Sequence, residues 1–119
     1  MRKLVTPRED NPVVLRVAMV ENSSKQFEFI WRPWEDMLGT ALSSVAYETD
    51  QGNVTFSGNS VSGSVATIRM TPTQAGQKLI KMTATMADTS KVVRYALLNV
   101  ADPQLWSTGG YYPFQYGLR

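Results

Sequence analysis

Hydrophobic and polar residues alternate along several short stretches of this chain, with a period of two residues. The clearest stretch is residues 25 to 31, where Phe27, Phe29 and Trp31 alternate with polar side chains. Residues 78 to 86 repeat the pattern. Such alternation is typical of a β-strand with one face in the core and the other in solvent. Almost no stretch keeps the helical period of roughly 3.6 residues, so the pattern predicts an all-β fold.

Seven short strands are expected, separated by turns that contain Gly, Pro, Asn and Asp. They span residues 12 to 20, 25 to 31, 43 to 49, 53 to 57, 65 to 71, 78 to 86 and 91 to 100. The third and fourth strands, with turn residues between them, are expected to form a hairpin. Residues 33 to 38 predict a single helical turn with Pro33 in its first position. Short strands without crossover helices predict an immunoglobulin-like β-sandwich, and a small barrel is the alternative.

The length of 119 residues and the 43% hydrophobic content predict one domain, placed at residues 12–102. Residues 1–11 carry charges around Pro7 with little to bury, and are expected to form an irregular N-terminal arm. Residues 103–119 are expected to form a C-terminal docking tail outside the domain.

The composition of residues 103–119 is unlike that of a solvated tail. The segment contains Gly and Pro, has Arg119 as its single charged residue, and is rich in aromatic residues. Its aromatic residues are Trp106, Tyr111, Tyr112, Phe114 and Tyr116. Large aromatic side chains form the cores of interfaces, so these five are candidate partner-binding residues. Two hypotheses remain open: the tail lies in a groove of a partner subunit, or it folds back over its own sandwich.

The cluster Trp31-Arg32-Pro33-Trp34 offers a sixth candidate. Trp31 is in phase with Phe27 and Phe29 and is expected in the core. Trp34 is either a core residue or a partner-binding residue. The methionines at positions 70, 82 and 86 are expected to fill the core.

Composition argues against catalysis and against several kinds of ligand. The chain contains no His and no Cys, which removes the usual general base, the thiol nucleophile and the usual zinc ligands. The carboxylates of Glu35-Asp36, and of Glu48 with Asp50, are close only in sequence. We therefore expect no enzyme activity, no metal and no cofactor.

Charge and hydropathy narrow the possible partners. The formal charge is +2 and basic residues are scattered, so no nucleic-acid interface is expected. No apolar run is long enough to span a bilayer, and the first residues lack the apolar stretch of a secretory signal. These features predict a protein without membrane partners that is made in the cytoplasm.

Three consecutive segments carry a resemblance to a known family. They are Phe27-Glu28-Phe29-Ile30-Trp31, Trp34-Glu35-Asp36-Met37-Leu38-Gly39 and Leu42-Ser43-Ser44-Val45-Ala46-Tyr47. Their order resembles the fiber-tail adaptor proteins of tailed bacteriophages, which are small immunoglobulin-like proteins. Residues 74–86 and 88–94 take the places of the family's later strand and hairpin. The chain lacks the family's Tyr in the penultimate strand, and Ser90-Lys91 replaces the Gly of the hairpin.

The resemblance implies a structural virion protein that joins the tail or neck to fibers or other appendages. It implies partners among tail tube, neck or fiber subunits, and a homo-oligomeric ring assembled in the cytoplasm of a bacterial host. Two alternatives remain open. One is a capsid decoration, or cement, protein. The other is a glycan- or receptor-binding module that uses Trp34 and the loops around Tyr47 and Asn59.

Overall fold

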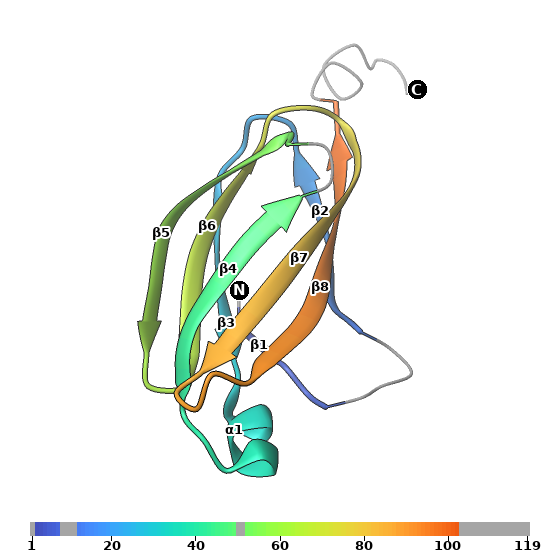
Figure 1. Ribbon diagram of the computed structural model, residues 1–119. Coiled ribbons are helices and arrows are strands. Elements are labelled where there is room, and N and C mark those ends of the chain that lie inside the picture. Colours follow the sequence, from blue (N-terminus) through green and yellow to red (C-terminus); the bar gives the residue numbers. More distant parts are fainter. Residues whose placement is uncertain (1, 8–11, 50–51, 103–119) are drawn as a thin grey trace.

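Two four-stranded sheets pack face to face in the computed structural model, which describes residues 2–7, 12–49 and 52–102 (Figure 1). The elements, in chain order, are β1 (Arg2–Leu4), β2 (Val13–Val20), β3 (Lys25–Ile30), α1 (Arg32–Leu38), β4 (Leu42–Thr49), β5 (Val54–Ser62), β6 (Val65–Pro72), β7 (Gly76–Met86) and β8 (Lys91–Ala101). The all-β sandwich predicted from the alternation is confirmed. Within the described part of the chain, no helix is long and apolar enough to cross a membrane.

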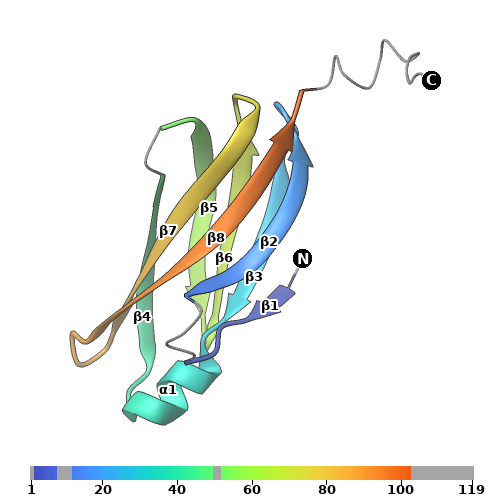
Figure 2. The same cartoon turned by 90° about the vertical axis from the view of Figure 1, so that its right-hand side faces the viewer.

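The strand order is β1-β3-β6-β5 in one sheet and β2-β8-β7-β4 in the other. Figure 2 shows the two sheets as separate layers. Leaving out β2, these orders are those of a constant-type immunoglobulin domain, in which the first, second, fifth and fourth strands face the third, sixth and seventh. Two pairings depart from that antiparallel plan, because β1 pairs in parallel with β3 and the additional strand β2 pairs in parallel with β8.

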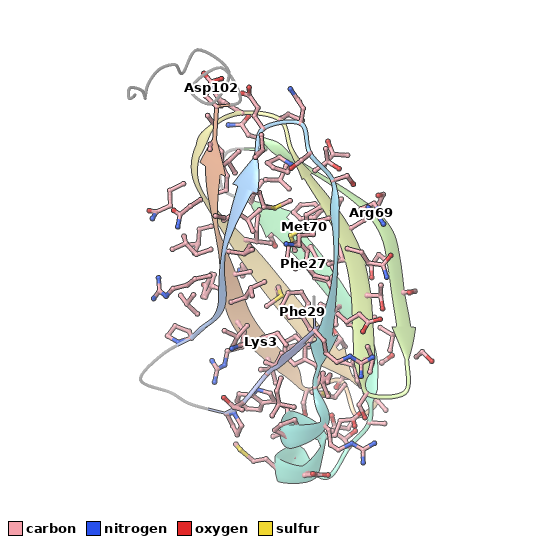
Figure 3. The ribbon with its side chains drawn as sticks, turned by 180° about the vertical axis from the view of Figure 1, so that it is seen from behind. Lys3, Phe27, Phe29, Arg69, Met70 and Asp102 are labelled. Atoms are coloured by element: carbon pink, nitrogen blue, oxygen red, sulfur yellow. The ribbon has the colours of Figure 1, made fainter. Side chains whose placement is uncertain are left out.

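The core lies between the sheets and follows from the period of two. Phe27, Phe29 and Met70 point into this space from β3 and β6, whereas Arg69 points outward (Figure 3). Burial of each large apolar side chain stabilises the fold by roughly 1.5–3 kcal/mol. Trp31 is 0% exposed, so its predicted place in the core is confirmed. The expected core methionines, Met70, Met82 and Met86, are also buried.

The hairpin expected between residues 43–49 and 53–57 does not form. The strand β4 pairs antiparallel with β7, and β5 pairs antiparallel with β6, so the two strands belong to different sheets. Each points its apolar residues, such as Val45 and Val54, into the shared core from opposite sides. The chain between them therefore connects the two sheets. Closeness of the two strands in the sequence did not determine which strands pair.

Part of the expected N-terminal arm is a strand. Lys3 pairs with Phe29, the N–H of Val5 donates a hydrogen bond of 2.8 Å to the carbonyl of Ile30, and the Val5 side chain is 0% exposed. An ion pair of 2.8 Å joins Arg2 to Glu28 on the surface. This segment is ordered because the apolar side chain of Val5 is buried and because the edge of β3 offers backbone groups for pairing. Residues 8–11 lie outside the described residues.

The strand β5 extends beyond the predicted residues 53–57. A β-bulge between Ser57 and Ser60 interrupts its pairing with β6, and Gly58 has a left-handed φ of 65° within the bulge. Glycine adopts this conformation without steric cost, so the strand continues through what the sequence suggested was a loop.

Candidate functional site

Five of the six predicted partner-binding residues lie within 103–119, outside the described residues. They are Trp106, Tyr111, Tyr112, Phe114 and Tyr116. Their role stays a prediction. The sixth, Trp34, belongs to α1, which covers one end of the sandwich (Figure 1).

The Trp34 side chain joins α1 to β8. It is 8% exposed, and the guanidinium carbon of Arg94 lies 4.7 Å from its ring centroid. The helix begins where the carbonyl of Trp31 accepts 3.0 Å hydrogen bonds from the N–H groups of Trp34 and Glu35, and it ends at Gly39 in a left-handed conformation. Because Arg94 lies over the ring and little of the side chain is exposed, Trp34 offers little surface on which a sugar or partner can stack.

Glu35 ties α1 to two neighbouring segments. Its Oε1 accepts a hydrogen bond of 2.6 Å from the hydroxyl of Ser64, and its Oε2 accepts one of 2.8 Å from the N–H of Leu42. The Ser64 hydroxyl, followed by the Leu42 N–H, lowers the pKa of Glu35 below its ordinary value, although partial burial opposes the shift. These hydrogen bonds give Glu35 a structural role in the connector between β3 and β4.

The carboxylates form no metal centre in the part of the chain that the structure describes. No group of three or more Asp or Glu residues that could hold a metal ion occurs within residues 2–7, 12–49 and 52–102. Glu35 and Asp36 have different surroundings. Glu35 is partly buried and accepts hydrogen bonds, whereas Asp36 is exposed. Asp50, the partner suggested for Glu48, lies outside the described residues.

The outer face of the β2-β8-β7-β4 sheet is apolar at its centre. In β8, the buried residues Val92, Ala96 and Leu98 face the core, so Val93, Tyr95 and Leu97 at the alternate positions point away from it. In the register of the sheet, Leu97 pairs with Leu79 of β7, and Tyr95 pairs with Val13 of β2. We call Val13, Leu79, Val93, Tyr95 and Leu97 the outer patch.

Charged side chains surround the outer patch. Glu48 of β4 pairs with Lys81 of β7, and Lys81 pairs with Tyr95. Arg16 of β2 pairs with Leu97. A shallow depression of about 170 Å³ is lined by Glu48, Thr49, Leu79, Lys81 and Tyr95. An apolar centre with a charged rim is the arrangement found at protein interfaces.

The outer face of the opposite sheet is polar over most of its area. Two neighbouring rows across it are Gln26–Arg69–Ser57 and Arg2–Glu28–Thr67–Ser60. Among the described residues of this face, the apolar side chains lie in the row Leu4–Ile30–Val65 near α1. The two sheets thus present different outer surfaces, since the outer patch crosses the middle of its sheet and the apolar row of the other sheet lies at one end.

Sequence reasoning missed the outer patch. The signal was present in β8, where the run Val92-Val93-Arg94-Tyr95-Ala96-Leu97-Leu98 is apolar on both faces instead of alternating. Strands that are covered on both faces have such runs.

No protein-family model matches the chain, and no curated protein matches its sequence. Among solved structures, the fold is similar to that of amebosin in solution, with a TM-score of 0.51 and 18% identity over 82% of this chain and 96% of that chain. It is also similar to a cysteine protease inhibitor from Entamoeba histolytica, with a TM-score of 0.53 and 12% identity over 84% of this chain and 95% of that chain. For domains 4 and 5 of the S-layer protein SbsC, the TM-score is 0.47 at 15% identity, over 73% of this chain and 47% of that chain.

At identities this low, the likeness to the first two structures is one of fold. Together with the strand order, it defines the chain as a small β-sandwich protein of the immunoglobulin-like class.

Proposed function

We propose that this chain is a non-enzymatic structural protein of a bacteriophage particle, an adaptor that joins the tail or neck to fibers or other appendages. The observation that carries the proposal is the composition of residues 103–119, an aromatic segment with one charge that directly follows the last strand. Exposure of so many aromatic side chains to water is unfavourable. Burial against a partner removes their apolar surface from water.

The sandwich supports this role as a rigid body. Its core of buried residues runs from Val5 to Val100 and draws on all strands except β1. Completely buried side chains from both sheets, such as Ile68 and Ile80, belong to this core. The described residues therefore form a core of their own, and the proposal assigns the aromatic segment to contact with another protein.

The absence of His and Cys from the sequence, and the structural use of Glu35, support a role without catalysis. The placement on a phage tail rests on the order of the segments in residues 27–47 that resembles the adaptor family. The glycan-binding alternative draws little support from Trp34, since Arg94 lies over its ring.

Particle incorporation tests the proposal. In a full-length variant, serine replaces the five aromatic residues Trp106, Tyr111, Tyr112, Phe114 and Tyr116. We expect this variant to keep the β-sheet circular dichroism spectrum and to be absent from purified particles. Arg119→Ala, which keeps every aromatic residue, is the matched control and should be incorporated normally. Normal incorporation of the serine variant would overturn the proposal.

Copy number separates the adaptor from a decoration protein. A ring at the tail or neck contains one copy for each symmetry-related position, whereas a decoration protein covers the repeated subunits of the capsid. Quantitative gel staining against the major capsid protein measures the difference. A copy number close to that of the capsid subunit would favour the decoration protein.

A further inference from the structure

The outer patch has the features of a docking surface. Its centre is aliphatic with one tyrosine, and Leu79 is 39% exposed. Tyrosine is enriched among the residues that contribute most to binding. The rim carries Arg16, Glu48 and Lys81, which keep their contact with water when the centre is covered. An occupant that is apolar and almost uncharged fits this centre, because it buries no unpaired charge.

Residues 103–119 have this chemistry and lie in the right place in the chain. They follow β8, the strand that supplies Val93, Tyr95 and Leu97 to the outer patch. A segment of this length reaches on the order of 55 Å when extended, which exceeds the length of any strand in the sheet. The segment is therefore long enough to leave one subunit and to cross the patch of another.

The direction of β8 favours a second subunit over the same one. The strand runs away from α1 and ends at the opposite end of the sandwich, where Asp102 lies (Figures 1 and 3). A chain that continues in this direction leaves its own outer face behind. To return to Tyr95 it must reverse and order a turn, whereas a subunit that lies beyond this end of the sandwich receives the segment without a reversal.

We propose that the outer patch of one subunit binds residues 103–119 of a second copy of this chain, so that copies join head to tail. The inference rests on the proposed function, since it names the surface that receives the aromatic segment in an assembly. A contact between two different surfaces of identical subunits is heterologous, and it produces a closed ring when the rotation between neighbours permits closure.

Self-association of the purified full-length chain tests the inference. We expect sedimentation velocity to show species larger than a monomer that grow with concentration. Leu97→Glu places a charge in the centre of the patch, and we expect it to weaken self-association at least about tenfold. Ser57→Glu places the same charge on the polar outer face of the opposite sheet. This control should associate as the unchanged chain does.

A mixing experiment distinguishes the two possible sources of the segment. The patch variant Leu97→Glu and the full-length serine variant of the five aromatic residues should each be monomeric. Mixed together, they should form heterodimers, because one retains the patch and the other retains the segment. No association in the mixture, or a monomeric unchanged chain at every concentration, would overturn the inference. If the unchanged chain is monomeric and Leu97→Glu makes residues 103–119 more sensitive to protease, the segment docks on the patch of its own chain instead.

The outcome is separable from that of the proposed function. If Leu97→Glu associates like the unchanged chain while the serine variant fails to enter particles, the inference fails and the proposed function stands. If the mixture forms heterodimers while the serine variant enters particles normally, the inference stands and the proposed function fails.

Discussion

The side-chain amide of Asn59 donates a hydrogen bond of 2.9 Å from Nδ2 to the backbone carbonyl of Val45. The bond joins β5, an edge strand of one sheet, to β4, an edge strand of the other. Edge strands present unpaired backbone groups to other chains, and proteins cover them in several ways. Here an asparagine in the bulge of β5 covers one carbonyl of β4.

Asn59→Ala removes this donor, and we expect it to lower the free energy of unfolding by about 0.5–1.5 kcal/mol. Amide hydrogen exchange in β4 should also become faster. Ser60→Ala, at the next and likewise exposed position, is the control and should change stability by less than about 0.5 kcal/mol. Equal urea midpoints for the two variants would contradict a stabilising role for the bond.

Arg94 and Trp34 form a cation–π contact between β8 and α1. Arg94→Ala removes the cation–π contact and the packing of the side-chain stem, so we expect a loss of about 1–2 kcal/mol in urea unfolding. Arg16→Ala removes an exposed arginine from the outer face of β2 and should leave the stability of the monomer nearly unchanged. Similar losses in both variants would show that the contact with Trp34 contributes little.

Glu35 makes stability dependent on pH. Its pKa in the folded state lies below the ordinary value of 4.5, so its contribution is present above that pH and disappears as the pH falls through the folded-state pKa. Glu35→Gln should lower the free energy of unfolding at neutral pH by about 1–2 kcal/mol. The difference from the unchanged chain should shrink in acid. Asp36→Asn, at the exposed neighbour, is the control, and a pH-independent difference for Glu35→Gln would contradict the assignment.

The hydroxyl of Tyr47 is buried and has no hydrogen-bond partner among the described residues. Burial raises the pKa of Tyr47 above its ordinary value of 10.0. Tyr47→Phe keeps the ring that stacks on Phe56 at 6.0 Å, so we expect stability at neutral pH to be unchanged or higher by up to about 1 kcal/mol. The unfolded state loses the phenol proton first, so stability should fall above pH 10 less steeply in this variant than in the unchanged chain. A loss of stability at neutral pH would indicate that the hydroxyl has a partner.

Leu97 and Leu98 are neighbours in β8 that face opposite ways. Leu98 is 0% exposed, and Leu98→Ala should cost about 2–5 kcal/mol because it leaves a cavity in the core. Leu97→Ala should cost about 1 kcal/mol or less in the monomer, because its side chain is only partly buried on the outer face. Urea unfolding of both variants in the background of the serine-substituted segment removes any contribution from association. Equal losses would show that the two faces of β8 are equally covered.

The sequence by itself determined which residues of the clearly alternating strands face the core. The alternation in residues 25–31 and 78–86 placed Phe27, Trp31 and Met82 correctly, because successive side chains of a strand point to opposite faces whatever its partners are. The absence of long helical periods determined the all-β class. The connector with Pro33 was also predicted, because proline suits the first turn of a helix.

Only the tertiary structure decided which strands pair. The period of two says nothing about neighbours, so β4 and β5 suggested a hairpin although they lie in different sheets. The burial of Trp34 depended in the same way on Arg94, which comes from a strand far along the chain.

The outer patch could not be predicted from the sequence, for a related reason. Since β8 is apolar on both faces, its sequence does not say which face is inside, and the packing of Leu98 against the opposite sheet settles that Leu97 points outward.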